Sequence, residues 1–409
     1  MPAGADEGGS PVSETTKPAA TPAGRSGHGA RPRVVVAGMG DTGVLVATRL
    51  ARSCDVVGIS TRPALVSGQE LGNRLTDPER WRRSYLVPYR RFRRLDRVRT
   101  VHGRISSVDL SGSTVQIEVS DGSTLVEPYD VLVIATGASN GFWRHDRVED
   151  MREIDTELAA VAAQLDGATT IAVVGGGATG VSVADNLARR GGTTVHLFHS
   201  DDEPLPGYHP KVRRWMAAEI RNDGVVVHPG HRAVVPDGFT GDRLTTGPVE
   251  WSTGQPPFDA DLTLWAVGGV RPHSSFLPAE LLDSDGFVRV DEHLQVPGHP
   301  NVFALGDVAA SDPLRSSARN WGYRVVVANV KARVHDGSGK VRTYEAPQYR
   351  WGSILGLQDD GLVVVQPNGT RFRIPRWLAE PLLFRLFVPR VLYGGLRSGV
   401  ARSRQRCNR

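Results

Sequence analysis

The stretch VVVAGMGDTG, residues 34–43, decides the fold of this chain. Its run of β-branched residues is typical of a buried parallel strand. Gly38, Gly40 and Gly43 have the G-x-G-x-x-G spacing: the first allows a tight turn, the second lets the backbone approach a pyrophosphate, and the third lets a helix lie against the strand. A pyrophosphate would then bind at the positive N-terminal end of a helix that begins near Thr42.

The same pattern recurs in IAVVGGGATG, residues 171–180. Gly175, Gly177 and Gly180 repeat the spacing after a second apolar strand. One such motif alone also occurs in turns that bind no ligand. Two copies in one chain predict two dinucleotide sites, one for a flavin dinucleotide and one for a nicotinamide dinucleotide.

The strand after each glycine loop should end in a carboxylate for the ribose, and neither strand does so directly. After the first loop the strand ends in Ser60 and Thr61, whose hydroxyls bind a ribose less strongly than a carboxylate. After the second loop the strand ends in His199 and Ser200, and two aspartates follow. These acids favour NADH slightly, but the sequence leaves NADH and NADPH open.

Small residues follow three further predicted strands, and they are Ala135, Thr136, Gly137, Gly268 and Gly306. Small side chains let the backbone pass close to a cofactor, although they also suit an ordinary turn. Asp307 follows the last of these strands. Its carboxylate can accept a hydrogen bond from a flavin ribityl hydroxyl, or equally cap a following helix.

The composition is that of an ordinary globular protein, because 40% of the 409 residues are hydrophobic and 23% are charged. The length predicts about two or three domains. Windows of about 18 consecutive apolar residues are absent, which argues against a membrane-spanning helix. Cys54 and Cys407 offer neither a disulfide framework nor a metal site, and they are compatible with a reducing cytosol.

Residues 1–31 are mostly Ala, Gly, Pro, Ser and Thr. Such a segment cannot bury enough apolar surface to offset its ordering entropy, so we expect a disordered lead. It lacks the apolar region of a secretory signal. We therefore expect a cytoplasmic protein.

The positive charge is concentrated in the tail. From residue 371 onward there are ten arginines and one acid, which gives this tail a charge of +9. The net charge of the whole chain is +5, so the rest of the chain carries −4. Apolar residues over 372–393 alternate with these arginines, and Pro375, Pro381 and Pro389 predict short helices instead of one long one. Such helices suit the surface of an anionic membrane or, equally, packing onto the body of the protein.

A second basic segment contains nine arginines between residues 79 and 99, interleaved with aromatic residues. We interpret this segment as a solvated face near the cofactor phosphates. Basic residues mixed with aromatics are also found where proteins bind nucleic acid. An anionic ligand or surface remains open.

The order of these features resembles the FAD-dependent pyridine-nucleotide oxidoreductase superfamily. Its signs are the two glycine loops, the turn 135–137, AVGG at 266–269 and LGD at 305–307. Within it, VRVDEHLQVPGHPNV at 288–302, LFHS at 197–200 and GLQDDG at 356–361 resemble the apoptosis-inducing-factor and ferroptosis-suppressor branch. The chain is also similar to type II NADH dehydrogenases. The resemblance covers residues 32–398.

The resemblance implies an α/β fold with two Rossmann-like three-layer domains, the NAD(P) domain being inserted in the FAD domain. The implied segments are a lead over 1–31, the FAD domain over 32–148 and 269–336, the NAD(P) domain over 149–268, and a C-terminal segment with the basic apolar tail over 337–409. The implied FAD contacts are Gly38, Gly40, Thr42, Gly43, Ser60, Thr61, Ala135, Thr136, Gly137, Gly306 and Asp307. The implied NAD(P)H contacts are Gly175, Gly177, Gly180, His199, Ser200 and Gly268.

Two positions depart from the branch. It carries a Glu two residues beyond the last glycine of the second loop, where this chain has Ser182. It also carries a Lys after the residue that matches Tyr344, where this chain has Glu345. Both positions lie near electron transfer in relatives, so the substrate and the rate are open. A redox-active cysteine pair is absent, which excludes a dithiol relay.

We therefore expect an FAD-dependent NAD(P)H oxidoreductase that passes electrons to a small-molecule acceptor. The resemblance implies that this acceptor is a quinone. The flavin would carry the reaction, so no acid–base pair need appear. Residues 372–398 would provide peripheral membrane contact. Two alternatives remain: a soluble reductase of a small redox protein, and a flavoprotein that binds nucleic acid or a partner.

Overall fold

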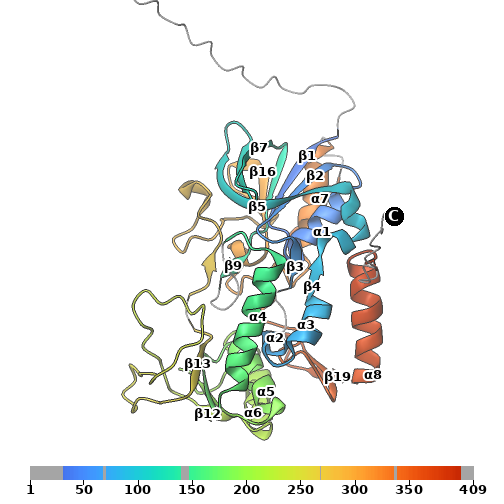
Figure 1. Cartoon of the computed structure of the whole chain (residues 1–409). Coiled ribbons are helices and arrows are strands. Elements are labelled where there is room, and N and C mark those ends of the chain that lie inside the picture. Colours follow the sequence, from blue (N-terminus) through green and yellow to red (C-terminus); the bar gives the residue numbers. More distant parts are fainter. Residues whose placement is uncertain (1–30, 68–70, 140–146, 268, 336–338, 398–409) are drawn as a thin grey trace, which may run out of the picture. The chain divides into compact units, whose positions relative to one another are not determined.

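The structure is a computed structural model that describes residues 31–67, 71–139, 147–267, 269–335 and 339–397. The predicted lead therefore lies almost wholly outside the described residues, and so does Gly268. Figure 1 shows the helices and strands along the chain, coloured from the N-terminus to the C-terminus.

The first glycine loop belongs to an eight-stranded sheet with the order β15-β16-β8-β1-β2-β5-β6-β7. Its strands are β1 (Arg33–Ala37), β2 (Asp55–Ser60), β5 (Val98–Asp109), β6 (Thr114–Val119), β7 (Thr124–Pro128), β8 (Val131–Ile134), β15 (Gln295–Val296) and β16 (His299–Ala304). β1 pairs in parallel with β2 on one side and β8 on the other. The predicted strand is therefore central, which is why it is apolar on both faces.

Alternate residues of β1 enter two different cores. Val34 and Val36 pack with α1 (Asp41–Leu50) and α7 (Gly322–Val334) on one face. Val35 and Ala37 face the opposite core, which includes residues of β5 and β6 and of the segment 276–288. The antiparallel strands β5, β6 and β7 form the predicted meander and extend the same sheet.

The second glycine loop belongs to a four-stranded parallel sheet with the order β12-β11-β10-β13. Its strands are β10 (Thr170–Val174), β11 (Thr194–Phe198), β12 (Val226–His228) and β13 (Leu262–Trp265), and its helices are α4 (Met151–Asp166), α5 (Ala178–Arg190) and α6 (Pro210–Asn222). The chain leaves the first sheet after β8 and returns to it at β15 and β16. The second unit is thus inserted in the first, as the fold class predicted, while the exact domain boundaries stay predictions.

Short elements connect the two sheets. They are β3 (Ala64–Val66), α2 (Leu71–Thr76), α3 (Pro78–Tyr85), β4 (Leu86–Pro88), the 3₁₀ turns η1 (Tyr89–Arg91), η2 (Arg93–Arg97), η3 (Ala279–Leu281) and η4 (Gly306–Val308), and the strands β9 (Ala138–Ser139) and β14 (Arg271–Pro272). β9 and β14 pair with each other where the chain enters and leaves the inserted unit. α2 packs against α5.

The C-terminal segment forms a small sheet of β17 (Leu357–Gln358), β18 (Gly361–Val365) and β19 (Arg371–Ile374), followed by a helical run. This run is α8 (Arg376–Ala379) continuing without a break into a π-helix, η5 (Glu380–Leu392). The prediction of several short helices was wrong. Pro375 caps the run. Pro381 lies where the α-helical turn passes into the π-helix, and Pro389 lies inside the wider π-helix.

One side of this tail packs onto the body of the protein. Val388, Leu392 and Leu396 contact the core around α1 and α7. The amide of Arg93 donates a hydrogen bond to the Gly395 carbonyl oxygen over 3.1 Å. Other apolar tail residues are exposed, so the structure favours neither of the two predicted roles alone.

Candidate active site

The first glycine loop has the conformation that its spacing predicted. Gly38 has φ of +94°, and a Cβ there would overlap the Ala135 carbonyl group. A Cβ on Gly43 would overlap the carbonyl oxygen of Gly38, so this glycine allows α1 to approach β1 closely. Gly40 has an ordinary φ of −71°, and a Cβ on it would meet no atom within 4 Å. Space for a ligand therefore lies against the Gly40 backbone.

A first cavity opens beside this loop. Its wall contains most of the residues implied for FAD, namely Gly38, Gly40, Thr42, Ser60, Thr61, Ala135, Thr136, Gly137, Gly306 and Asp307. They come from the carboxyl ends of β1, β2, β8 and β16, which meet at one edge of the parallel sheet. Asp307 lies in the turn η4 and does not cap α7, which begins at Gly322.

Three wall residues of the first cavity were not among the predicted FAD contacts, although Tyr89 belongs to the segment 79–99 that was expected near the cofactor phosphates. The Tyr89 hydroxyl donates a hydrogen bond to the Met39 carbonyl oxygen over 2.9 Å, and burial raises the pKa of this hydroxyl. The amide of His273 donates to the Gly137 carbonyl oxygen over 3.0 Å. Arg62 also lines the cavity and pairs with the buried Glu149 at 2.6 Å. These residues come from distant segments, so only the folded chain brings them together.

The second glycine loop repeats the geometry of the first. Gly175 has φ of +127°, and a Cβ on it would overlap the Ala266 carbonyl group. A Cβ on Gly180 would overlap the Gly175 carbonyl oxygen, whereas one on Gly177 would meet no atom within 4 Å. At the end of β11, His199 is buried and Ser200 is exposed. Burial lowers the pKa of His199, so its ring is neutral at pH 7.

A second cavity of about 400 Å³ lies where the two loops face each other, a volume within the range of small-molecule pockets. Thr42 and Asp307 line it from the first unit, and Thr179 and Ser182 line it from the second. The rest of the wall is mainly apolar and aromatic: Leu45, Trp321, Tyr323, Trp351, Ile354, Phe387, Leu392 and Tyr393. Because Asp41, Thr42, Asp307 and Ala318 line both cavities, the two are adjacent.

The two positions that depart from the branch have different surroundings. Ser182 is 4% exposed, and its hydroxyl has no hydrogen-bond partner in the described part of the chain. The residue lines the second cavity, although its hydroxyl oxygen is itself buried. Glu345 is exposed, and it is not among the residues that line either cavity.

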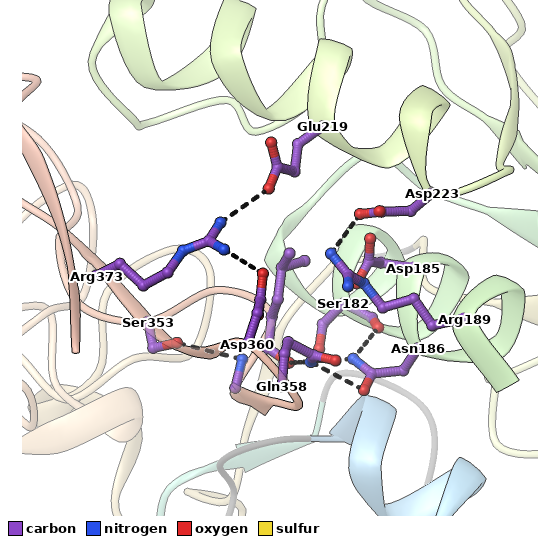
Figure 2. A network of polar contacts seen from close by, with 12 residues as sticks. Ser182, Asp185, Asn186, Arg189, Glu219, Asp223, Ser353, Gln358, Asp360 and Arg373 are labelled. Atoms are coloured by element: carbon purple, nitrogen blue, oxygen red, sulfur yellow. Dashed lines mark hydrogen bonds and ion pairs between the residues drawn. The ribbon is translucent and has the colours of Figure 1, made fainter. Parts of the chain in front are cut away.

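The helix that carries Ser182 is fixed to the C-terminal segment by a polar network (Figure 2). The Asn186 amide donates to the Ser182 carbonyl oxygen over 2.8 Å and to that of Leu355 over 3.1 Å. Gln358 donates in turn to the Asn186 side-chain oxygen over 3.2 Å. These bonds hold the start of α5 beside the wall of the second cavity.

The same network contains a buried carboxylate. The Arg189 guanidinium contacts Asp185 at 3.0 Å and Asp223 at 2.5 Å (Figure 2). Asp185 is fully buried, and this burial raises its pKa to about 7; the charge of Arg189 opposes the rise and the neighbouring Asp223 adds to it. Asp185 is therefore poised between its neutral and charged forms near physiological pH.

The residues present fit two dinucleotides. Each loop leaves open space at its middle glycine, where a pyrophosphate would approach the backbone at the start of a helix. Ser182, whose buried hydroxyl has no partner among the described residues, is one of the residues that line the cavity where the units meet. When both groups are bound, a flavin supplies the chemistry of accepting a hydride from a nicotinamide and passing electrons onward.

The family model for pyridine nucleotide-disulphide oxidoreductases matches residues 32–332, and the chain belongs to this family. Members of the family use FAD together with NADH or NADPH. The predicted superfamily and cofactors are thereby confirmed.

Individual relatives agree with the predicted branch. The chain is 29% identical over 308 residues to oxidoreductase ptaL of Pestalotiopsis fici (72% of this chain, 76% of that protein). It is 25% identical to apoptosis-inducing factor homolog B of Dictyostelium discoideum (83% and 90%). It is also 25% identical to the type II NADH:quinone oxidoreductase Ndh of Mycobacterium tuberculosis (58% of each).

Among solved structures, the fold is similar to that of an NAD-dependent persulfide reductase from A. fulgidus, with a TM-score of 0.61 and 20% identity. The match covers 85% of this chain and 65% of that one, so this chain spans less than two-thirds of that structure's length. At this identity the likeness shows the fold alone.

Proposed function

We propose that this oxidoreductase holds FAD in the first cavity, takes a hydride from NADH or NADPH bound at the second glycine loop, and delivers electrons to a quinone-type acceptor in the second cavity. The observation that carries the proposal is the wall of the second cavity. It touches both dinucleotide units and is otherwise lined mainly by aromatic and apolar side chains. A planar, apolar acceptor suits such a wall, and its position beside both loops favours electron transfer.

The residues of this chain would bind and orient the two cofactors and the acceptor, and would exclude water from them. In the first cavity the proposed FAD contacts are those implied by the sequence, with Tyr89, Arg62 and His273 added. At the second loop, Gly175, Gly177, Gly180, His199 and Ser200 are the proposed NAD(P)H contacts; Gly268 lies outside the described residues. Ser182 would form part of the wall of the second cavity, whereas Glu345 has no assigned role.

Backbone strain at one wall residue also favours a ligand site in the second cavity. Trp321 has φ of +61°, a left-handed conformation that costs a bulky residue energy. It is 38% exposed and lines the second cavity. Such strain is commonly retained where it positions a side chain for a ligand. We therefore assign Trp321 and Trp351 to contact the rings of the acceptor.

An apolar quinone would reach this cavity from a bilayer surface, and the exposed apolar residues of the tail favour peripheral contact through residues 372–398. Within the described residues, no helix combines the length and apolarity needed to cross a membrane. A second candidate is reduction of a small acidic redox protein, because exposed arginines could steer such a partner.

The experiment follows the flavin spectrum of the purified protein without oxygen. We expect a yellow protein that NADH or NADPH bleaches and that a quinone rapidly reoxidises. A colourless protein that takes up no FAD overturns the cofactor assignment, and flavin that neither nucleotide reduces overturns the activity. Reduced flavin that reacts with an iron–sulfur protein but with no quinone supports the second candidate instead.

A matched pair of variants tests the acceptor site. Trp351→Ala removes an aromatic wall of the second cavity, whereas Trp215→Ala removes a partly buried tryptophan of α6 that is not among the residues that line it. We expect the first to raise the KM for quinone about tenfold or more, the equivalent of about 1.4 kcal/mol, with flavin reduction unchanged. Equal effects of the two variants would count against the site.

A further inference from the structure

Three guanidinium groups gather where the end of the tail meets the body. The Arg49 guanidinium stacks over the Tyr323 ring at 4.5 Å and donates to its hydroxyl oxygen over 3.4 Å. Arg324 donates to the same hydroxyl oxygen over 3.2 Å. Arg94 lies directly against Gly394, because a Cβ there would overlap its guanidinium. We call Arg49, Arg94 and Arg324 the arginine cluster.

The charge of the arginine cluster is not neutralised within the described part of the chain, where none of the three forms an ion pair with a carboxylate. Burial lowers the pKa of Arg49, Tyr323 opposes this, and the nearby charges of Arg94 and Arg324 lower it further. Three like charges that repel one another without a counter-ion are typical of a site that receives an anion.

This anion is not the cofactor pyrophosphate. Arg49 lies in the last turn of α1, whereas the first glycine loop lies before its first turn. At 1.5 Å per residue, the eight residues from Asp41 to Arg49 place the two ends about 12 Å apart. The C-terminal end of a helix by itself favours one cation, but it does not account for Arg94 and Arg324.

An apolar surface lies beside the arginine cluster. Leu382, Leu386, Phe387 and Val391, which we call the tail strip, are 46%, 43%, 41% and 57% exposed. Their spacing of four, one and four residues matches the period of about 4.4 residues per turn in a π-helix, so they share one face. The Tyr393 amide, which donates to Val388 five residues earlier over 3.1 Å, shows this wider winding directly.

The arginine cluster contacts the tail at the residue next to the end of the tail strip. Arg49 donates to the carbonyl oxygen of Leu392, the residue after Val391, over 3.4 Å. Arg324 lies over the exposed Trp321 ring at 4.2 Å. Apolar side chains, an exposed tryptophan and arginines thus lie together, which is the composition that membrane interfaces attract.

We propose that the arginine cluster binds the phosphate group of an anionic phospholipid while the tail strip enters the apolar part of the leaflet. The proposal rests on the quinone activity proposed above and names the surface that serves it. Phe387 and Trp321 are both exposed and both line the second cavity. A bilayer bound here therefore meets the rim of the cavity that would take the quinone.

The test measures co-sedimentation of the full-length, FAD-loaded protein with vesicles of phosphatidylcholine, with and without phosphatidylglycerol. Each arginine near an anionic surface contributes about 1 kcal/mol, or about fivefold. We expect Arg94→Gln combined with Arg324→Gln to lower partitioning onto phosphatidylglycerol vesicles about 25-fold, with little change on phosphatidylcholine alone. The matched control is Arg214→Gln combined with Arg243→Gln, two exposed arginines of the inserted unit.

A double variant that binds phosphatidylglycerol vesicles as tightly as the wild type overturns the proposal. So does an equal loss in the control, because net charge alone would then explain binding. Competition by inorganic phosphate without any vesicle binding would assign the cluster to a free anion and overturn the lipid site. Leu386→Ser, on the exposed strip, is expected to weaken binding to both kinds of vesicle.

Reduction of a water-soluble quinone is measured in parallel. Vesicle binding without quinone reduction supports the lipid site and overturns the proposed acceptor. Quinone reduction without binding to phosphatidylglycerol overturns the lipid site and leaves the proposed function standing. The two failures are therefore distinguishable.

Discussion

The Tyr393 hydroxyl lies 3.4 Å from the Asp41 carboxylate, although 352 residues separate them in the sequence. Asp41 begins α1 directly after Gly40, and Tyr393 ends the tail helix. Burial raises the pKa of Tyr393 well above its usual range, and the charge of Asp41 raises it further. The phenol therefore stays protonated and donates, which connects the tail to the loop proposed to hold the flavin.

Tyr393→Phe should loosen the tail without opening a cavity. The variant loses one hydrogen bond to a carboxylate, so we expect it to lower the free energy of unfolding by about 1 kcal/mol and to speed proteolysis within the tail helix. Urea unfolding and limited proteolysis measure the two effects. Tyr349→Phe, whose ring packs against His209, is the control. Identical behaviour of the two variants would show that the contact contributes nothing.

Substitution of the turn glycines should impair the binding of one cofactor at a time. Ala at Gly38 or Gly175 meets both a positive φ and a backbone carbonyl group, whereas Ala at Gly122, with φ of +87°, meets no atom within 4 Å. We expect Gly38→Ala to lose flavin and Gly175→Ala to keep it but lose reduction by NADH or NADPH. Gly122→Ala should show only the cost of the φ angle, about 1 kcal/mol. The flavin absorbance and its bleaching provide the measurement.

The middle glycines should behave in the opposite way. Gly40 and Gly177 have φ of −71° and −72°, and a Cβ on either meets no protein atom within 4 Å. Both glycines are N-cap residues, where alanine is less favourable, so alanine should lower the free energy of unfolding of the cofactor-free protein by no more than about 1 kcal/mol. The new methyl group would occupy space proposed for a pyrophosphate. We expect affinity to fall about tenfold or more, for FAD with Gly40→Ala and for NAD(P)H with Gly177→Ala, and titration calorimetry to detect it.

Asp185 should make the protein less stable as pH rises. Its folded-state pKa of about 7 exceeds the value of 3.8 expected when unfolded, so the folded state holds the proton more tightly. The stability from the neutral carboxyl is complete below about pH 4 and is lost as pH rises through about 7. Asp185→Asn should flatten this dependence in urea unfolding.

A control for this pH dependence is available near α5. Asp166→Asn removes an exposed carboxylate that contacts Arg190 at 2.7 Å. Its pH profile should follow that of the wild type. If the Asp185→Asn profile also runs parallel to the wild type between about pH 5 and pH 8, the raised pKa is contradicted.

Local patterns predicted the frame of the molecule, because they depend on neighbouring residues. The two glycine loops and their flanking strands were readable from spacing and apolar runs, whereas the insertion of one unit in the other was implied by the family resemblance. Asp307 was likewise placed at the mouth of the first cavity by its position after a strand. Such features follow from backbone geometry that a short stretch of sequence determines.

The walls of the second cavity could not be predicted in this way. Trp321, Trp351 and Tyr393 come from separate segments and meet only through tertiary packing. Pro389 indicated a break in the tail helix because the rule for proline applies to the α-helix, and the wider π-helix accommodates it. Nor did the sequence indicate that Arg49, Arg94 and Arg324 would gather around Tyr323.

The strand order also constrains how the protein is made. β16 pairs with β8, yet it is synthesised only after all the strands of the inserted sheet. A growing chain therefore completes the four strands between Thr170 and Trp265 while the first sheet still lacks its far edge. Since domains generally fold as units during synthesis, the nucleotide-binding insert is ready before the flavin-binding unit around it can close. Stable loading of the flavin then waits until residues 295–307 have left the ribosome, after the inserted unit is complete.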